Sequence, residues 1–381
     1  MEYLSVGEYA KIQGIHPRMV QRRCQAGLIP GAYKLGNNWL IPKCVDPTGA
    51  IEKEDKSLVS SLEYLTFASG QSDKHLESLP KNSAYYMAKG LFFYYRCNYE
   101  QALCEFDKIT PVDDDYLGSR LFSLYTLICI GDFSRYRSIL PIFDISCAKE
   151  LNIPELLPVM ECFQANINVS VSVLHNIPDW LKKGDLSSLP PIMKDLTWYT
   201  YIKYLQVIKD YRVMLAVAEA RISTQKEGHY SLSDIYAYLY AALGHIKQDN
   251  PELARKRMMT IMNLAIPDGF IGPFVETLTT MQGLTERCIL EAFPQQYENI
   301  VNIWMKIFPN WVKVHNELSA NTISEVLTRR EHQVALYAVD GLTNNQIASK
   351  MYISLSTVKN DLSCIYDKLG ITGRHQLKKM F

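Results

Sequence analysis

The sequence predicts a mainly α-helical protein with three folded units. Apolar residues recur every three or four positions over most of the 381 residues, the period of a helix that buries one face. Helix-start signals precede many of these runs, and a β-hairpin pattern occurs only near the N-terminus. We expect an N-terminal unit, a linker, a central helical unit and a C-terminal helical unit, with these bounds: 1–45, 46–61, 62–315 and 316–381.

The N-terminal unit has the pattern of two short helices followed by a hairpin. Ser5 and Glu8 have the spacing of a capping box, in which each side chain satisfies a backbone N–H of the first turn. Pro17 is suited to the first turn of the next helix, which we expect to end before Gly27. Residues 33–41 alternate around a Gly-Asn-Asn turn. This order of elements predicts a winged helix-turn-helix.

The same segment resembles the excisionase/MerR-type winged helix. The residues that carry the resemblance are Leu4-Ser5, Glu8-Tyr9-Ala10, Gly14-Ile15, Val20, Arg22, Gly27-Leu28-Ile29-Pro30, Lys34, Gly36, Trp39 and Ile41-Pro42. The resemblance implies that four side chains lie in or along the major groove: Arg18, Gln21, Arg22 and Arg23. It also implies that Lys34, Asn37 and Asn38 present the wing to the DNA backbone or minor groove. The alternative is a small structural cap with solvated arginines, or a protein-contact domain.

A repeat is visible in the central unit, after a charged linker that contains Asp46-Pro47-Thr48-Gly49. Cys97-Asn98-Tyr99 and Gly131-Asp132-Phe133 are two inter-helix turns 34 residues apart. Gly90, Phe93, Ala102 and Phe106 occupy the small and large positions of a tetratricopeptide repeat. Residues 199–222 and 236–261 are later candidates for helix pairs. We therefore expect a tetratricopeptide-like helical domain.

Residues 254–274 are similar to the end of the helical sensor domain in large LuxR-type activators of the maltose-regulator kind. The similarity rests on Leu264-Ala265, Pro267, Gly269-Phe270 and Pro273-Phe274. Those activators carry an ATP-binding switch domain, but this chain has no G-x-x-x-x-G-K-[ST] motif. We expect no cofactor. The run Phe92-Phe93-Tyr94-Tyr95 is expected to pack between helices rather than hold a ligand.

The C-terminal unit contains three short helices. Thr328 with Glu331, and Thr343 with Gln346, have capping-box spacing, and Ser354 is a candidate N-cap. In the helix that follows, the apolar positions are Val358, Leu362, Ile365 and Leu369, which share one face. The opposite face carries Ser356, Asn360, Ser363 and Asp367, with Lys359 on its flank. Two short helices before a polar-faced helix predict a helix-turn-helix.

Residues 327–377 resemble a LuxR-type helix-turn-helix DNA-binding domain with four helices. The matching residues are Leu327-Thr328, Arg330-Glu331, Gly341-Leu342-Thr343-Asn344, Ile347-Ala348, Ile353-Ser354, Thr357-Val358-Lys359, Lys368-Leu369-Gly370 and Arg374. The resemblance implies that Lys359, Asn360 and Ser363 face base edges in the major groove. It implies phosphate contacts for Thr343, Asn344 and Thr357, beside Ser356 on the same polar surface.

The resemblance also implies partners for this unit. They are double-stranded DNA, a second copy of the chain paired through a last helix at 373–381, and RNA polymerase. Asp361 departs from the family, in which many members have histidine. A carboxylate near phosphates would weaken DNA binding, so we expect modest affinity for each domain.

Charge and cysteine content agree with a DNA-binding protein of the reducing bacterial cytosol. Residues 1–50 and 320–381 each have an excess of three basic residues, whereas the middle has 26 basic and 32 acidic residues. The nine cysteines form no C-x-x-C pair, and the histidines are not clustered, so no metal site or disulfide frame is expected. The longest apolar run is too short for a membrane span, and no signal peptide is visible.

Two functional hypotheses follow. The first is a transcriptional regulator whose helical domain receives a small-molecule or protein signal and controls DNA binding by the terminal units, which read a composite site or bridge two sites. The alternative is a helical-repeat interaction scaffold in which one terminal unit no longer binds DNA; the small charge excess and Asp361 motivate it. No constellation of residues supports an enzyme.

Overall fold

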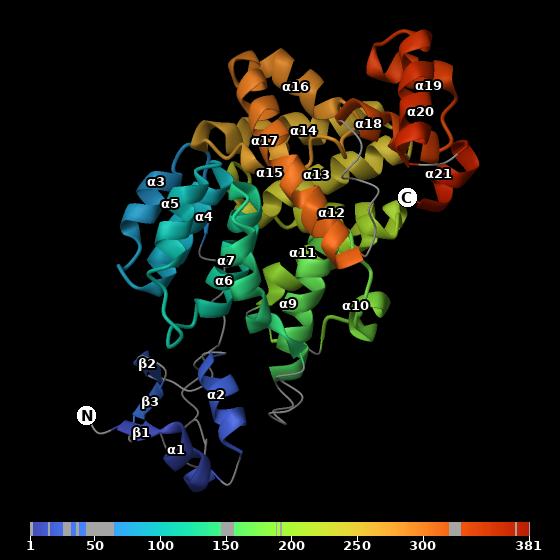
Figure 1. The fold of residues 1–381 in the computed structure, drawn as a ribbon. Coiled ribbons are helices and arrows are strands. Elements are labelled where there is room, and N and C mark those ends of the chain that lie inside the picture. Colours follow the sequence, from blue (N-terminus) through green and yellow to red (C-terminus); the bar gives the residue numbers. More distant parts are fainter. Residues whose placement is uncertain are drawn as a thin grey trace.

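The computed structural model describes residues 3–13, 16–25, 32–35, 38–42, 65–145, 156–187, 189–190, 193–319, 329–369 and 372–380. These residues are mainly helical, with two small antiparallel sheets (Figure 1). The mainly α fold class predicted from the sequence is confirmed. The linker expected at 46–61 lies outside the described residues.

The N-terminal unit consists of two helices and a three-stranded sheet. Its elements are β1 (Tyr3–Ser5), α1 (Val6–Gln13), α2 (Pro17–Gln25), β2 (Tyr33–Leu35) and β3 (Asn38–Pro42). The capping box is present: Glu8 Oε2 accepts from Ser5 N at 2.7 Å, and Glu8 N donates to Ser5 Oγ at 3.3 Å. Strand β1 was not predicted; it pairs with β3 and gives the sheet order β1-β3-β2. Three residues are too few to show the alternation of a strand.

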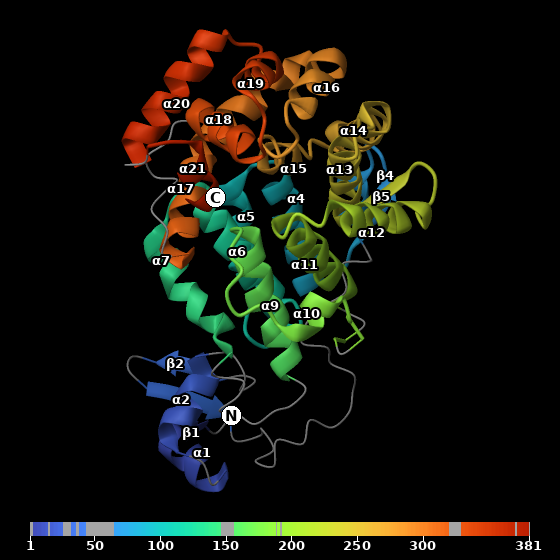
Figure 2. The same ribbon diagram turned by 90° about the vertical axis from the view of Figure 1, so that its right-hand side faces the viewer.

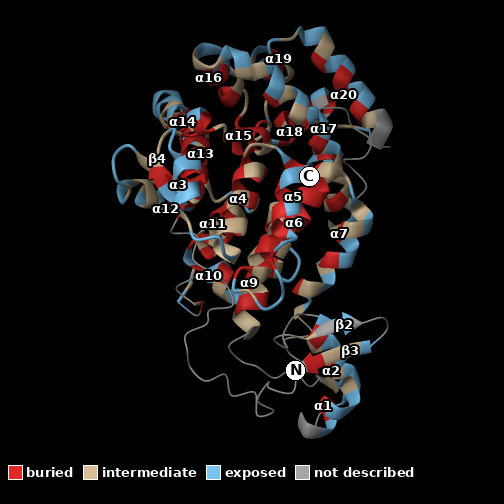
Figure 3. Cartoon of the chain, turned by 90° about the vertical axis from the view of Figure 1, so that its left-hand side faces the viewer, coloured by how far each residue is buried: buried red, intermediate tan, exposed pale blue. Residues whose placement is uncertain are grey.

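The central helical domain contains the helix pairs that the repeat spacing predicts. Its elements are β4 (Thr66–Ala68), α3 (Ser72–Ser78), α4 (Ser83–Tyr95), α5 (Tyr99–Phe106), α6 (Tyr116–Ile130), α7 (Phe133–Ile139), η2 (Leu140–Phe143), α9 (Leu156–Ser170), α10 (Asp179–Lys183), α11 (Lys194–Val207), α12 (Tyr211–Ser223), β5 (His229–Ser231), α13 (Leu232–Lys247), α14 (Pro251–Ala265), η4 (Ile266–Asp268), α15 (Gly272–Glu276), α16 (Leu284–Ala292) and α17 (Pro294–Ser319). The pairs are α4–α5, α6–α7, α11–α12 and α13–α14. Buried residues line the inner sides of these helices (Figure 3).

In each helix pair, the turn between the two helices has the same backbone conformation. A residue with positive φ precedes an Asn or Asp that begins the next helix, at Cys97-Asn98, Gly131-Asp132, Lys209-Asp210 and Asp249-Asn250. Three of the four Asx side chains accept a backbone N–H of the following helix: Asp132, Asp210 and Asn250. The side chain therefore satisfies one of the donors that a helix start leaves unpaired.

The first pair is close-packed at Gly90, as the repeat pattern requires. A Cβ at Gly90 would lie 2.4 Å from Cε1 of Phe106. Phe106 and Ala102 are fully buried. Glycine therefore lets the aromatic ring of α5 lie directly on the backbone of α4.

The first part of the helical domain is joined directly to segments that lie far along the chain. β4 pairs with β5, with Phe67 opposite Tyr230. Asp268, which is buried, accepts hydrogen bonds from Gly70 N at 2.8 Å, Ser72 N at 2.9 Å and the Tyr230 hydroxyl at 2.6 Å. Strand β4 falls where a helical pattern was expected from residue 62. Its three residues take strand geometry because they pair with a segment far along the chain.

The C-terminal unit has four helices around its own small core (Figure 2). They are α18 (Arg329–Val339), α19 (Asn344–Met351), α20 (Leu355–Leu369) and α21 (Arg374–Met380). The core contains Val334, Ile347, Val358, Leu362, Ile365 and Leu377. Helix α17 runs to Ser319, past the boundary expected after residue 315.

Candidate nucleic-acid interface

Helix α20 has one buried apolar face and one exposed polar face. Val358 and Ile365 are fully buried and Leu362 is 5% exposed. On the opposite side, the exposed residues are Ser356, Lys359, Asn360, Ser363 and Cys364. The Leu369 and Asp367 side chains are not among those described. The structure therefore brings together, on one open surface, the three residues that were predicted to meet base edges: Lys359, Asn360 and Ser363.

Local hydrogen bonds fix the starts of α19 and α20. Thr343 and Gln346 form the predicted capping box, with Thr343 N donating to Gln346 Oε1 at 2.8 Å. Ser354 Oγ accepts from Thr357 N at 3.1 Å, which makes Ser354 the N-cap of α20. Thr328 of the third predicted cap lies outside the described residues. The hydroxyl groups of Thr343, Ser356 and Thr357 are thus held at the first turns of these two helices.

Arg374 of α21 fixes the orientation of Asn344. Its guanidinium donates to the side-chain oxygen of Asn344 at 2.7 Å and to the carbonyl of Leu342. The Asn344 amide N–H₂ makes no hydrogen bond within the described residues, and it is a donor of the kind that phosphate oxygens accept. Arg374 therefore holds the side chain of Asn344, one of the predicted phosphate contacts, in a fixed orientation.

Asp361 does not lie on the exposed polar face of α20. It is 4% exposed and pairs with Arg330 of α18, with contacts of 2.7 Å and 2.8 Å between the two guanidinium nitrogens and the two carboxylate oxygens. This ion pair raises the pKa of Arg330 through the side-chain hydrogen bond to Asp361. The premise that this carboxylate lies free beside the phosphates was wrong, because Asp361 is buried and paired with Arg330. Its effect on DNA affinity stays a prediction.

Sequence reasoning missed two exposed side chains beside this surface. Tyr352 ends α19 with φ of 55° and is 82% exposed, and Leu355 at the start of α20 is 38% exposed. An aromatic residue in a turn between two polar-faced helices was the available signal. Leu355 directly precedes Ser356 and Thr357, and Tyr352 lies in the turn before them.

The candidate residues of the N-terminal unit are only partly brought together. Arg18, Gln21 and Arg22 are exposed on α2. Arg23 is partly buried, and its Nε is buried without a hydrogen-bond partner in the described part of the chain, so it points inward. Lys34 and Asn38 are exposed on the hairpin, and Asn37 lies outside the described residues.

The C-terminal unit is held against the helical domain. Lys247 Nζ of α13 lies 3.4 Å from Asp340 Oδ2, and Lys350 of α19 donates to the side-chain oxygen of Gln282. Both contacts join residues that belong to different units. Neither uses the exposed face of α20, so docking leaves that face open.

The helical domain contains a cavity of about 760 Å³, and α18 forms part of its wall. Gln333, Leu336, Tyr337, Val339 and Asp340 contribute from α18 or directly after it. Tyr337 and Val339 are also members of the C-terminal core. Tyr94 and Tyr95 are buried between helices, as expected, and they also line the cavity.

Two other features were searched for in the residues that the structure describes. No three His, Cys, Asp or Glu side chains gather there in a way that would hold a metal ion. None of the helices in that part of the chain is both long enough and apolar enough to cross a membrane.

These features define the class of the C-terminal unit. Two short helices joined by a tight turn, the second with an exposed polar face, form a helix-turn-helix. Residues 325–381 match the family described as bacterial regulatory proteins, luxR family. The C-terminal unit is a luxR-type helix-turn-helix domain.

Regulators from two bacterial genera are similar to part of this chain. The protein described as "HTH-type transcriptional regulator MalT" from Serratia proteamaculans (strain 568) is 25% identical over 139 residues. The protein with the same description from Yersinia pestis (strain Pestoides F) is 27% identical over 139 residues. In both cases the match covers 32% of this chain and 15% of the relative's length. No solved structure matches the chain.

Proposed function

We propose that this protein is a transcriptional regulator that reads DNA through α20. In this proposal Lys359, Asn360 and Ser363 contact base edges in the major groove. Phosphate contacts come from the first turns of α19 and α20, through Thr343, Asn344, Ser356 and Thr357. The observation that carries the proposal is the exposed polar face of α20, set on a domain that matches the luxR family.

The helical domain is proposed to receive the signal. Helix α18 connects the C-terminal domain with the cavity of the helical domain. Its residues Tyr337 and Val339 are part of the C-terminal core and also line the cavity. A ligand or partner that changes the cavity wall would therefore move α18, the helix against which α20 packs. The signal is a small molecule or a protein, and its result is a change in the position or pairing of the DNA-binding domains.

The N-terminal unit is proposed as a second DNA reader. Arg18, Gln21 and Arg22 are exposed on α2, and Lys34 and Asn38 on the hairpin. Two different readers on one chain would recognise a composite site or bridge two sites. A second copy of the chain, paired through α21, and RNA polymerase are further proposed partners.

The test is selection of bound fragments from a genomic DNA library by the intact protein, Lys359→Ala and Arg22→Ala. We expect the intact protein to enrich one motif and Lys359→Ala to lose it. Loss in Arg22→Ala as well supports the composite site, whereas an unchanged motif in Arg22→Ala removes the N-terminal unit as a reader.

Salt dependence separates this proposal from the scaffold alternative. A protein that neutralises several phosphates loses affinity steeply as salt rises, by about 10³-fold or more between 50 and 200 mM for six phosphates. A flat salt response with no enriched motif would contradict DNA reading and favour the scaffold. The pairing of Asp361 with Arg330 removes one of the two arguments for that alternative.

A further inference from the structure

The cavity of the helical domain has the size and wall chemistry of a small-molecule site. Its volume of about 760 Å³ lies in the range of roughly 300–1,000 Å³ that ligand pockets occupy. Aromatic rings make up much of its wall, among them Tyr94, Tyr125, Tyr199, Tyr236, Trp304 and Trp311. Flat ring faces bury ring-containing or apolar molecules well.

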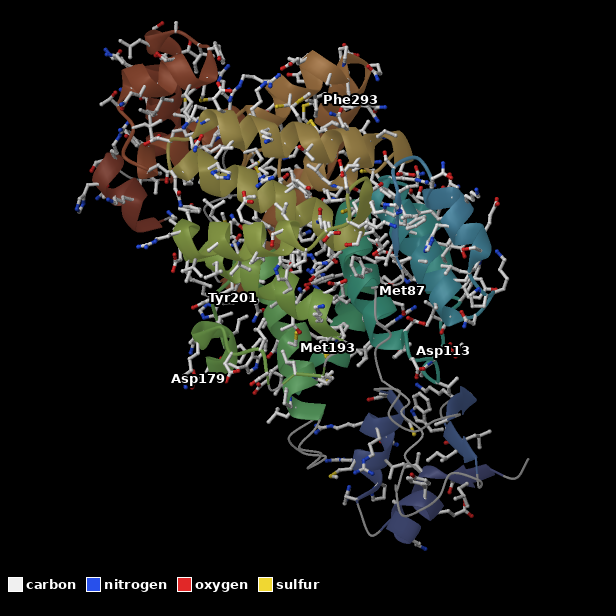
Figure 4. All side chains as sticks on the ribbon, turned by 180° about the vertical axis from the view of Figure 1, so that it is seen from behind. Met87, Asp113, Asp179, Met193, Tyr201 and Phe293 are labelled. Atoms are coloured by element: carbon white, nitrogen blue, oxygen red, sulfur yellow. The ribbon has the colours of Figure 1, made fainter. Side chains whose placement is uncertain are left out.

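Helix α11 presents a polar row to this cavity. Tyr199, Lys203 and Gln206 all line it and, at spacings of four and three, share one face. Tyr201, labelled in Figure 4, packs instead with Leu181 and Trp180 of α10. Lys203 is two residues further on, about 200° around the helix, and therefore projects to the opposite side.

Lys203 is a charged donor for which the described residues provide no partner. It has no hydrogen bond and no ion pair to any residue that the structure describes, and it is partly buried in the cavity wall. Burial lowers the pKa of Lys203 to about 8, and the charge of Glu276 acts in the opposite direction. At neutral pH the ammonium is therefore still charged, and its three donors are unused.

The acidic groups of the cavity already have partners. Glu276 accepts from the hydroxyls of Tyr94 at 2.7 Å and Tyr236 at 2.5 Å. Asp195 lies 2.8 Å from Arg221, and Asp340 lies 3.4 Å from Lys247. Lys203 thus has no hydrogen bond or ion pair with the described charged groups of the wall, although the charge of Glu276 acts on it. The buried amide oxygen of Gln206, one turn away, also lacks a donor among the described residues.

We propose that the cavity binds a small molecule whose anionic group pairs with Lys203 and whose ring or apolar body lies between the aromatic side chains. The anionic group is a carboxylate or a phosphate, and a hydroxyl or N–H beside it would donate to Gln206. This inference rests on the proposed signal-receiving role of the helical domain and gives the chemical class of the signal. An anion supplies the partner that the buried ammonium lacks.

The test compares two fluorescent probes of nearly the same shape on the intact chain. 8-Anilinonaphthalene-1-sulfonate carries an anionic group, and N-phenyl-1-naphthylamine does not. We expect one sulfonate probe to bind per chain and to bind more tightly than the neutral amine. In Lys203→Met the affinity for the sulfonate falls by about 30-fold or more, while affinity for the neutral amine is unchanged.

Lys209→Met is the matched control, because Lys209 lines the rim and is exposed; it keeps the affinity of the intact protein. Lys203→Arg, which retains a cation, keeps most of the affinity for the sulfonate. Thermal unfolding of Lys203→Met checks that the variant is folded. Equal sulfonate affinity in Lys203→Met and the intact protein, or equal affinity of the intact protein for both probes, overturns the proposal.

Competition identifies the anionic group. Displacement of the sulfonate probe by 1-naphthoate assigns a carboxylate ligand, and displacement by 1-naphthyl phosphate assigns a phosphate ligand. Displacement by neither overturns the proposal. Because these measurements contain no DNA, their failure leaves the DNA-reading proposal standing, and failure of the fragment selection leaves the cavity site standing.

Discussion

Asp361 is the residue whose role changes most between sequence and structure. Asp361 is a neighbour in sequence of the exposed polar residues of α20. In the structure it is 4% exposed and paired with Arg330. The two residues are 31 positions apart. Their contact depends on how α18 crosses α20, which the apolar spacing of either helix does not reveal.

Removing Arg330 should destabilise the C-terminal domain more than neutralising Asp361. Arg330→Ala leaves a buried carboxylate without a partner and should cost about 2 kcal/mol. Asp361→Asn leaves only an arginine that is more than half exposed, so it should cost about 1 kcal/mol after allowance for solvent screening. Hydrogen exchange of the α20 amides in the intact chain measures both.

Asp361→Asn should not tighten DNA binding; a clear gain in affinity would restore the view that this carboxylate repels phosphates.

Cys364 should report on DNA contact. Cys364 and Cys104 are exposed, and Cys24, Cys129, Cys162 and Cys288 are buried. Burial raises the pKa of Cys24 and Cys288 to about 11 and that of Cys162 to about 12, which suppresses the reactive thiolate. Among the described cysteines, iodoacetamide should therefore modify Cys104 and Cys364 first. Peptide mapping by mass spectrometry gives the rates.

A DNA fragment selected as above should protect Cys364 and leave Cys104 unaffected. Cys364 lies on α20 one turn after Asn360, so a helix seated in the major groove would cover it. Cys104, in the helical domain, is the internal control. Equal alkylation of Cys364 with and without bound DNA would place the interface on another surface.

At the scale of single elements, the packing of α4 on α5 depends on one glycine. Gly90→Ala places a methyl group against the buried ring of Phe106, and overpacking of this kind costs about 2 kcal/mol. The matched control is Gly118→Ala in α6, where the nearest atom is the flexible Cε of Met87 at 3.3 Å. That control should be neutral or gain up to about 1 kcal/mol from helix propensity.

Thermal unfolding of the intact chain measures both glycine variants. The double variant Gly90→Ala with Phe106→Leu should recover part of the loss, since leucine removes the ring atoms that the methyl group meets. If Gly90→Ala and Gly118→Ala have the same unfolding temperature, the close approach of the two helices does not limit stability.

Helix boundaries were predictable where the determining residues are neighbours. Ser5–Glu8 and Thr343–Gln346 exchange hydrogen bonds over three residues, so their capping boxes follow from local chemistry alone. The polar and apolar faces of α20 were predictable for the same reason. The cavity was not, because its wall combines α4, α11, α15, α17 and α18, whose relative positions no local pattern specifies. Without the cavity, nothing in the sequence distinguishes Lys203 from other lysines on helices.

At the scale of the whole molecule, the buried charge of Lys203 should lower stability at neutral pH. The folded pKa of about 8 lies below the ordinary value of 10.5, so the unfolded chain binds this proton more tightly. The penalty is complete below pH 8 and disappears as the pH approaches 10.5. Lys203→Met should therefore gain about 3 kcal/mol at pH 7 and roughly 1 kcal/mol at pH 9.5.

Urea unfolding of the intact chain at these two pH values measures the difference from the unsubstituted protein. Taking the difference removes the effect of the buried cysteines, which destabilise the folded state at alkaline pH in both proteins. Lys226→Met, at an exposed lysine, should show no change at either pH. A pH-independent gain in Lys203→Met would mean that the side chain is solvated in the folded protein.

The contacts of Asp268 bear on how the chain folds as it is synthesised. A simple solenoid can add one repeat at a time, because each repeat contacts only its neighbours. Here Asp268 accepts hydrogen bonds from Gly70 and Ser72, 198 and 196 positions earlier. The segment that contains β4 and the start of α3 therefore completes these contacts only after residues made much later by the ribosome have emerged. Closing so long a loop is slow. We therefore expect the aromatic residues of the early segment to stay exposed during synthesis, and exposed apolar surface of this kind is what chaperones bind.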